Sequence, residues 1–208
     1  MGLFITKYAK IDAHALSVDG EKKFQSQEQQ IGKVFKSIYK YLELKYPKYH
    51  KMDKLCKLGF LTAEPLFQDQ DILSKYQPEE IAVILSNAHS TINIDTQYQD
   101  SIKDKENYFP SPSLFVYTLP NIVIGEIAIR HHLKGEIGFL ISPRFDAKLI
   151  KNYVDNIFED RAIKACLTGW VDIDEKNRYK SVLFLVEKED NSQDNITFEV
   201  ENLESLFN

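Results

Sequence analysis

The chain has few of the residues that mark secreted or disordered proteins. Among its 208 residues are two cysteines, eight glycines and seven prolines. Scarce glycine and proline argue against long disordered linkers. Two cysteines can form at most one disulfide, and the N-terminal stretch has no small-residue cleavage site and carries charges among its apolar residues, so it is not a secretory signal. We therefore expect Cys56 and Cys166 to be reduced, buried thiols in a cytoplasmic protein.

Long apolar runs and an excess of positive charge are also missing. The most apolar stretch, residues 114–129, is interrupted by Thr118, Pro120 and Glu126 and is too short and too polar to span a membrane. The net charge is -5, from 26 lysines and arginines against 31 aspartates and glutamates. Nucleic-acid-binding proteins usually present a basic face. We expect neither a membrane nor a nucleic acid as a partner.

Motifs for common cofactors and nucleophiles are absent as well. The sequence has no glycine-rich phosphate loop and no serine in a nucleophile elbow. The five histidines, two of them adjacent at His131 and His132, lack the spacing of a metal site. We expect neither a cofactor nor a metal ion. From residue chemistry alone, the chain is a soluble α/β protein without evident catalysis.

What the chain does have is apolar periodicity. Residues at helical spacing predict helices over 27–45, 52–68, 120–134 and 146–159, with Pro47 ending the first and Pro65 ending or kinking the second. Short apolar runs predict strands at the N-terminus and near 81–88, 137–142, 163–171, 179–187 and 196–200. The stretches between them include a polar, irregular connection over 89–112 and a solvated turn over 187–194. This order predicts a mixed sheet with helices on its faces, in a single domain spanning residues 1–208.

Four segments carry short motifs in a fixed order along nearly the whole chain. They are YPKYHKMDKLCKLGFLTAEPLF from Tyr46, EEIAVILSNAHST from Glu79, SPSLFVYTLPNIVIGEIAIRHHLKGE from Ser111 and ACLTGWVD from Ala165. In the third and strongest, Asn121, Gly125 and Gly135 are in register with a Thr-x-x-Asn-x-x-x-Gly pattern followed by Leu-x-Gly. Together the segments resemble the N-terminal half of the β-ketoacyl-acyl-carrier-protein synthases, the thiolase-like ketosynthases of fatty acid and polyketide assembly.

The resemblance implies half of a thiolase-like fold without its catalytic centre. In the family, the strand after the glycine matched by Gly135 leads to the nucleophilic cysteine, and counting along GEIGFLISPRFD places Arg144 at that position. An arginine cannot act as a thiol nucleophile. The family's catalytic histidines and lysine belong to a second half, which we expect this chain to lack. The resemblance therefore implies a protein that is not a condensing enzyme.

The resemblance also implies a partner. In the family, the strand that leads to the cysteine pairs across the dimer axis, and a half fold should leave an apolar face exposed on helix 120–134 or helix 146–159. Some ketosynthases form heterodimers with a cysteine-less relative, the chain length factor, whose side chains close the far end of the partner's acyl tunnel. This chain would then pair with an active ketosynthase in fatty acid, polyketide or polyene biosynthesis. The implied dimer edge is Ile137, Phe139, Leu140 and Ile141, and the implied tunnel or interface residues are Leu114, Phe115, Tyr117 and Asn121.

Other interpretations stay open. One is a thioester activity through Cys166 or Cys56, for which the sequence offers no nearby base. Another is a free-standing homodimer that binds an acyl chain or an acyl-carrier protein, whose acidic surface would meet the lysines at 45, 48, 51, 54 and 57. Those lysines also fit a solvated helix face, and the tunnel candidates also fit an ordinary core.

Overall fold

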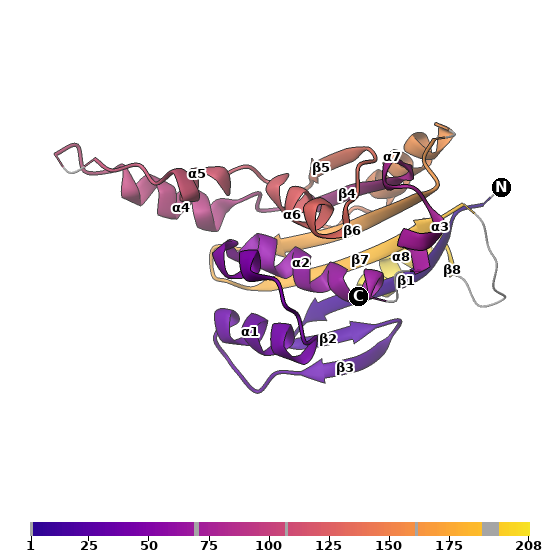
Figure 1. Cartoon of the computed structure of the whole chain (residues 1–208), viewed down its shortest axis with the longest axis horizontal. Helices are drawn as coiled ribbons and strands as arrows, with labels where there is room; N and C mark the ends of the chain where they lie inside the picture. The colour runs from indigo at the N-terminus through magenta and orange to yellow at the C-terminus, as the bar shows by residue number, and fades with distance from the viewer. Residues whose placement is uncertain (1, 69–70, 107, 161, 189–195) are drawn as a thin grey trace.

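The computed structural model describes residues 2–68, 71–106, 108–160, 162–188 and 196–208. At its centre is one mixed sheet with the strand order β3-β2-β1-β7-β6-β4-β5, and β8 pairs with β1 (Figure 1). Strands β4, β5 and β6 are parallel, and the other pairs are antiparallel. The strands are β1 (Phe4–Asp12), β2 (Ala15–Val18), β3 (Glu21–Gln25), β4 (Ile81–Asn87), β5 (Ile137–Ile141), β6 (Ala165–Ile173), β7 (Tyr179–Glu187) and β8 (Ile196–Thr197). The mixed α/β sheet predicted from the sequence is confirmed.

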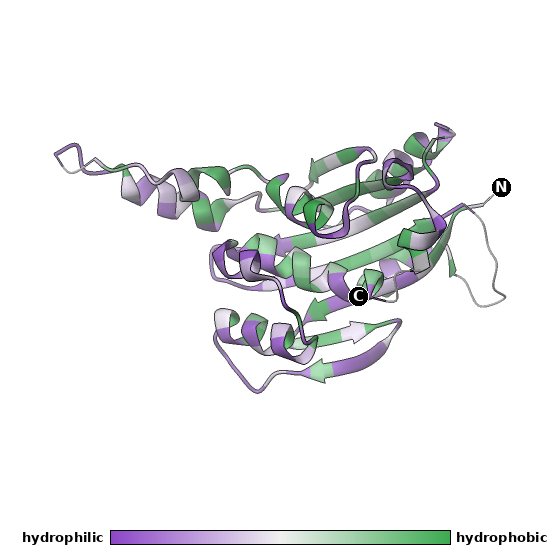
Figure 2. Ribbon diagram, in the orientation of Figure 1, coloured by the Kyte–Doolittle hydropathy of each residue, from purple (hydrophilic) through white to green (hydrophobic). Residues whose placement is uncertain are grey.

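Strand β4 shows why the sheet forms where the sequence predicts it. All seven residues of β4 are buried, and the strand lies between β6 and β5. A nearly continuous run of isoleucine, valine and leucine is typical of a parallel strand that is covered on both faces. Figure 2 shows the same concentration of hydrophobic residues on the central strands.

Helices on one face of the sheet cover the larger core. They are α1 (Ile31–Tyr41), α2 (Lys54–Phe67) and α6 (Ile122–His131), which lie in front of the sheet in Figure 1, with the short elements η1 (Pro47–Lys51), α3 (Asp71–Lys75) and η2 (Pro78–Glu80) between them in sequence. Leu58 and Leu61 of α2 and Ile127 of α6 are fully buried there. Gly59 lets α2 approach α6 closely, because a side chain at this position would collide with Val123.

Two helices cover the opposite face with a separate core. They are α7 (Ala147–Glu159) and α8 (Val200–Phe207). Ile150 and Val154 of α7 pack with Leu203 of α8 and with Phe184 of β7. The predicted helix at 146–159 is confirmed, and Asp146 caps it as a residue with a short acceptor side chain should.

A third group of helices leaves the body of the molecule. Residues 92–118, which we call the arm, contain α4 (Ile92–Ser101) and α5 (Pro112–Val116) and project from the sheet in Figure 1. Helix α4 has one buried residue, Ile94, and α5 has none. The rings of Tyr98 and Phe115 pack against each other with centroids 5.5 Å apart, so the two helices of the arm contact one another.

Several predictions of local structure were wrong. The first helix covers Ile31–Tyr41 and not 27–45, because the chain turns at Glu43, where φ is 51°. Pro65 neither ends nor visibly divides α2, which continues to Phe67, because a proline in the last turn removes a single backbone hydrogen bond. The connection over 89–112 is not irregular, since it contains α4. Strands β2 and β3 were not separated from the N-terminal strand, and the solvated turn predicted at 187–194 falls largely outside the described residues.

Candidate functional site

The loop between β5 and α7 contains the position at which the resemblance implies a cysteine in the ketosynthases. Arg144 lies in this loop and is exposed, and in the described part of the chain its guanidinium makes no ion pair or hydrogen bond. The carboxylate of Asp146 accepts a hydrogen bond from the backbone N–H of Leu149 at 2.9 Å. A negative charge thus already lies at the helix N-terminus, where the helix dipole would otherwise stabilise a thiolate.

Three aromatic rings pack beside this helix terminus. Phe145 stacks on Phe207 of α8 with centroids 4.1 Å apart and 2° between the ring planes, and Trp170 of β6 meets both rings edge-on. The Nζ atom of Lys180 lies 4.1 Å from the centroid of the Phe207 ring. We call Phe145, Trp170 and Phe207 the aromatic seal. These three rings fill the space beside the N-terminus of α7, and none of them carries a nucleophile.

Both cysteines lie away from this loop and are buried. Cys56 of α2 is 3% exposed and Cys166 of β6 is 0% exposed, and neither is in a disulfide. Burial raises the pKa of both thiols, so both stay protonated at neutral pH. The expected burial of the two thiols is confirmed, and the geometry does not favour a thioester activity at either.

Of the two helices expected to expose an apolar face, α6 does and α7 does not. On α6, Ile129 is 58% exposed while Glu126 is 4% exposed. On α7, Leu149 is 36% exposed, and the other exposed residues are polar: Lys148, Asn152, Asn156 and Glu159. The face of α7 that points away from the sheet is therefore suited to water, whereas the outer side of α6 is not.

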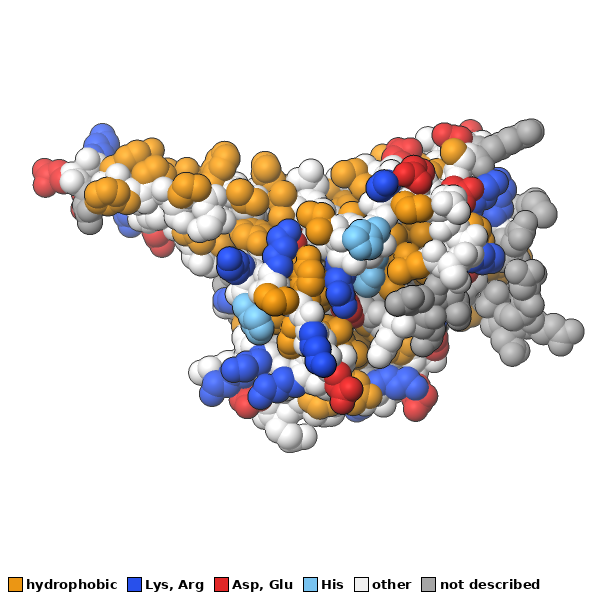
Figure 3. Space-filling model, in the orientation of Figure 1, with side chains coloured by type: hydrophobic (Ala, Val, Ile, Leu, Met, Phe, Trp, Pro, Cys, Tyr) orange, Lys and Arg blue, Asp and Glu red, His pale blue; other side chains and the backbone are white. Residues whose placement is uncertain are grey.

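Exposed apolar side chains continue from the arm to β5. Figure 3 shows hydrophobic side chains gathered over the arm and along the border of the molecule where α6 and β5 lie. We call this surface the apolar edge. Strand β5 pairs with β4 alone within the described sheet, so its other side is unpaired. The members of the apolar edge, with their exposed fractions, are Phe115 (53%), Val116 (46%), Leu119 (49%), Ile129 (58%), Ile137 (53%) and Ile141 (54%).

The structure brings together two of the four residues predicted for a tunnel or interface, because Leu114 and Tyr117 both line a crevice of about 270 Å³ between the arm and α2. Phe115 belongs to the apolar edge. Asn121 is exposed and precedes α6 without capping it through its side chain. Tyr117 turns toward the body, where its hydroxyl donates a hydrogen bond to Glu126 Oε1 at 3.2 Å. Of the predicted edge strand, Ile137 and Ile141 are exposed, whereas Phe139 and Leu140 are half-buried.

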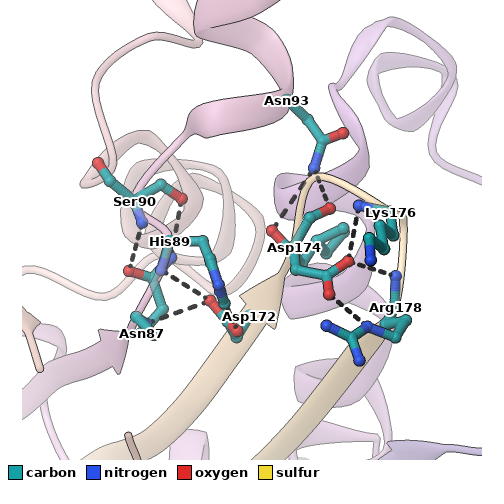
Figure 4. Close-up of polar contacts among 10 residues, drawn as sticks. Asn87, His89, Ser90, Asn93, Asp172, Asp174, Lys176 and Arg178 are labelled. Atoms are coloured by element: carbon teal, nitrogen blue, oxygen red, sulfur yellow. Dashed lines mark hydrogen bonds and ion pairs between the residues drawn. The ribbon is translucent and has the colours of Figure 1, made fainter. Parts of the chain in front are cut away.

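A polar cluster that the sequence analysis missed holds the start of the arm (Figure 4). Asp172 Oδ2 lies 2.8 Å from His89 Nδ1, and Asp172 Oδ1 accepts the backbone N–H groups of Ala88 and His89. Asn93 donates from Nδ2 to the carbonyl oxygen of Asp174 at 2.8 Å. These bonds join the loop after β4 to the β6–β7 hairpin. In the sequence, a polar run after each strand indicates a turn, but it does not indicate which two turns contact each other in the fold.

Buried charges beneath α6 were missed as well. Arg130 donates to both carboxylate oxygens of Glu64, at 2.7 Å and 3.2 Å, and His131 Nε2 lies 3.5 Å from Glu64 Oε1. Burial, with nearby Arg130 and His132, lowers the pKa of His131 to about 3, so this imidazole is neutral. On the same helix, Glu126 Oε2 lies 2.8 Å from the Nζ atom of Lys48. The buried sides of α2 and α6 therefore contain paired charges as well as the apolar residues from which the helices were predicted.

The described residues offer neither a metal site nor a membrane-spanning helix. No group of three or more histidine, cysteine, aspartate or glutamate side chains in these residues is arranged to hold a metal ion. Among the described helices, none is long and apolar enough to cross a membrane.

Comparison with known proteins rests on structure, because no protein-family model matches this chain and no curated protein matches its sequence. A chain of the ishigamide ketosynthase/chain length factor is similar with a TM-score of 0.66 and 16% identity, over 93% of this chain and 64% of that chain. A chain of the ketosynthase ApeO in complex with its chain length factor ApeC, from Xenorhabdus doucetiae, is similar with a TM-score of 0.57 and 13% identity, over 100% of this chain and 90% of that chain.

A third similar structure is AntDE:AntF, a type II PKS acyl-carrier protein in complex with its ketosynthase bound to the hexaketide. Its TM-score is 0.61 at 10% identity, over 89% of this chain and 62% of that chain. This chain thus spans less than two thirds of the ishigamide and AntDE:AntF chains that it matches, but nine tenths of the matched chain in the ApeO–ApeC complex. Identities this low speak for the fold alone. The thiolase-like α/β fold expected from the sequence is confirmed, and it is the fold that this chain shares with these ketosynthase and chain-length-factor complexes.

Proposed function

We propose that this chain is a non-catalytic, chain-length-factor-like subunit that pairs with an active ketosynthase in fatty acid, polyketide or polyene biosynthesis. The observation that carries the proposal is the contrast at β5. The strand leads into a loop with Arg144 where a ketosynthase has its cysteine, while its outer side stays unpaired and apolar. The chemistry is missing and the surface for a partner is present.

The surroundings of Arg144 support a role without catalysis. The carboxylate of Asp146 caps α7 and would raise the pKa of any thiol placed beside it. The ring of Phe145 is engaged with Phe207 and Trp170 and fills the adjacent space. A single substitution of Arg144 by cysteine would therefore not restore a reactive thiolate, because charge and packing around it also differ from what a nucleophile needs.

The apolar edge supports a role in association. An unpaired edge strand with exposed isoleucines at Ile137 and Ile141 can add a strand from a partner and bury apolar area at the same time. The arm extends this surface through Phe115. In the proposed heterodimer, Leu114 and Phe115 are the residues of this chain placed to limit the space left for the partner's acyl chain. Excess bulk at such a position typically costs about 1–3 kcal/mol.

The α7 face supports a unit of one domain covering residues 1–208. On this face α8 packs beside α7, and the aromatic seal joins the two helices at one end. The outward residues of α7 are polar except Leu149, so the partner is proposed to bind at the apolar edge and not at this face.

The test is native mass spectrometry of the tagged chain isolated from its own host. We expect a one-to-one complex with a protein that carries the ketosynthase cysteine. Replacing Ile137 and Ile141 together by lysine should remove the partner, because two desolvated apolar contacts are worth about 2 kcal/mol or more at the centre of an interface. The matched control is Leu149→Lys, which adds the same charge at an exposed apolar position on α7. A monomer or homodimer with no larger partner contradicts the proposal.

One observation favours a second candidate, a homodimeric module that binds an acyl-carrier protein or its acyl chain. Lys51, Lys54 and Lys57 line the crevice between the arm and α2, and none of them is within ion-pair distance of a carboxylate in the described part of the chain, although Lys54 donates to Asn177 Oδ1 at 2.7 Å. A group of cations at a crevice favours an acidic partner. Carrier-protein binding that weakens steeply with salt, by a stable homodimer that recruits no ketosynthase, would select this candidate.

A further inference from the structure

Beyond the bond of Asn93 to the β6–β7 hairpin and the burial of Ile94, the arm has few contacts that fix its direction. Helix α5 has no buried residue, and the side chains toward the tip include Phe109, which is 78% exposed. At the base of the arm, Thr91 Oγ1 donates to the carbonyl oxygen of Thr118 at 3.0 Å. This bond joins the segment that enters the arm to the segment that leaves it. This clasp closes the arm on itself. It does not by itself set the angle between the arm and the body.

Tyr117, the residue that follows α5, supplies a contact between the arm and the body. Its hydroxyl donates to Glu126 Oε1 at 3.2 Å, and the other oxygen of that carboxylate lies 2.8 Å from Lys48 Nζ. Glu126 is 4% exposed and belongs to α6, while Lys48 belongs to η1. Two consecutive elements, the end of the arm and α6, therefore meet η1, which is distant in sequence, at one buried carboxylate.

The chemistry of this cluster favours a fixed geometry. A buried carboxylate must keep its partners, because losing one leaves part of its charge unpaired in a medium of low dielectric constant. Burial, together with the nearby Glu126 carboxylate, raises the pKa of Tyr117, so its hydroxyl remains a donor throughout the neutral range. Tyr117 is only half-buried, and its ring also packs against the core under α2 and α6.

We propose that Tyr117, Glu126 and Lys48 form an anchor that fixes the direction of the arm. Tyr117 is then a positioning residue and not a residue that lines an acyl tunnel. If the arm contacts a partner, as the proposed function has it, the anchor raises affinity without touching that partner, because an arm already in its bound direction loses less freedom on association. This second step rests on the proposed function, and the first does not.

The first measurement is hydrogen–deuterium exchange of the isolated protein, read for backbone amides of α4 and α5. Tyr117→Phe keeps the ring and removes the donor, and we expect exchange in the arm to become about tenfold faster. Exchange at amides of β6 and β7 should change much less than exchange in the arm, which a general loss of packing would not allow. Lys48→Met, at a half-exposed side chain of a different element, should act in the same direction.

The matched control is Tyr98→Phe. Tyr98 lies on the arm itself, and its ring contact with Phe115 survives the loss of the hydroxyl. Exchange in the arm that is the same in Tyr117→Phe as in the unsubstituted protein overturns the anchor.

The second measurement is affinity for the co-purified ketosynthase partner. We expect Tyr117→Phe to weaken binding by about tenfold, chiefly through slower association. Faster exchange with unchanged affinity supports the anchor and contradicts the place of the arm in the proposed interface. The two failures are therefore distinguishable.

Discussion

Helices α6 and α7 cover opposite faces of the same sheet and are built in opposite ways. Helix α7 buries Ile150 and Val154 and presents mainly polar side chains outward, with Leu149 as the one apolar residue among those exposed in the described helix. Helix α6 buries the carboxylate of Glu126 and exposes Ile129. The first arrangement is that of a surface helix in water, and the second is that of a helix with a neighbour on its outer side.

The difference between α6 and α7 distinguishes a face that is packed by the chain itself from a face that is suited to a partner. On the α7 face, the chain's own α8 and the aromatic seal complete the packing. On the α6 face, apolar side chains remain exposed, and the sheet edge next to it stays unpaired. We therefore expect the proposed partner on the α6 side and not on the α7 side.

The largest expected effect is in the core of α7. Ile150→Ala should lower the free energy of unfolding by about 2–5 kcal/mol, because Ile150 is 1% exposed and its removal leaves a cavity. The neighbouring Leu149→Ala should change it by about 0.5 kcal/mol or less, since Leu149 lies on the outer side. Urea unfolding measures both. Equal losses in the two variants would mean that the outer side of α7 is packed against something.

The aromatic seal should give the next largest effect. Phe207→Ala removes a stacked ring from a half-buried position, and we expect a loss of about 2 kcal/mol. Trp170 is the single tryptophan of the chain, so its fluorescence reports on the seal directly. Emission should shift to longer wavelength in Phe207→Ala and stay unchanged in Phe115→Ala, which alters an exposed ring on the arm. A shift in both variants would mean that Trp170 also senses the arm, and the α7 face and the α6 side would then not be independent.

The buried imidazole of His131 on α6 should make the free energy of unfolding depend on pH. The pKa of His131 is lowered from 6.5 to about 3 in the folded protein. Between those values the unfolded chain binds a proton that the folded chain does not, so stability falls as the pH drops below about 6.5, by about 1.4 kcal/mol per pH unit. Above that pH the group makes no difference. His131→Gln should flatten the profile between pH 6.5 and 5, and an unchanged slope would mean that the imidazole is not buried.

Periodicity predicted the elements that bury a regular apolar face. Strand β4 follows its pattern because a continuous apolar run suits a strand buried on both faces, and helix α7 follows its pattern because every third to fourth residue faces the core. The position of Arg144 in the loop before α7 also followed from counting along the sequence. Local patterns suffice where one element packs against one sheet.

The rest of the site depends on contacts between distant segments. Helix α4 was missed because the sequence INIDTQYQDS has no apolar face, as expected for a helix in an arm that buries little more than Ile94. The pairing of Tyr117 with Glu126, and of His89 with Asp172, joins residues whose proximity no local pattern encodes. Polar contacts between segments are therefore the part of this site that sequence alone could not supply.

The smallest expected effect is the sharpest test of the comparison. Ile129→Gln replaces an exposed isoleucine on α6 by a residue that favours helices slightly more, so the free energy of unfolding should stay the same or rise by a few tenths of a kcal/mol. In that case Ile129 does not stabilise the isolated protein, and we expect it to contribute to the affinity for the partner instead. The same variant should weaken binding to the co-purified ketosynthase, measured by titration, while Leu149→Gln on α7 should not. A clear loss of stability in Ile129→Gln would instead make the outer side of α6 part of the chain's own core, and the contrast between the two helices would disappear.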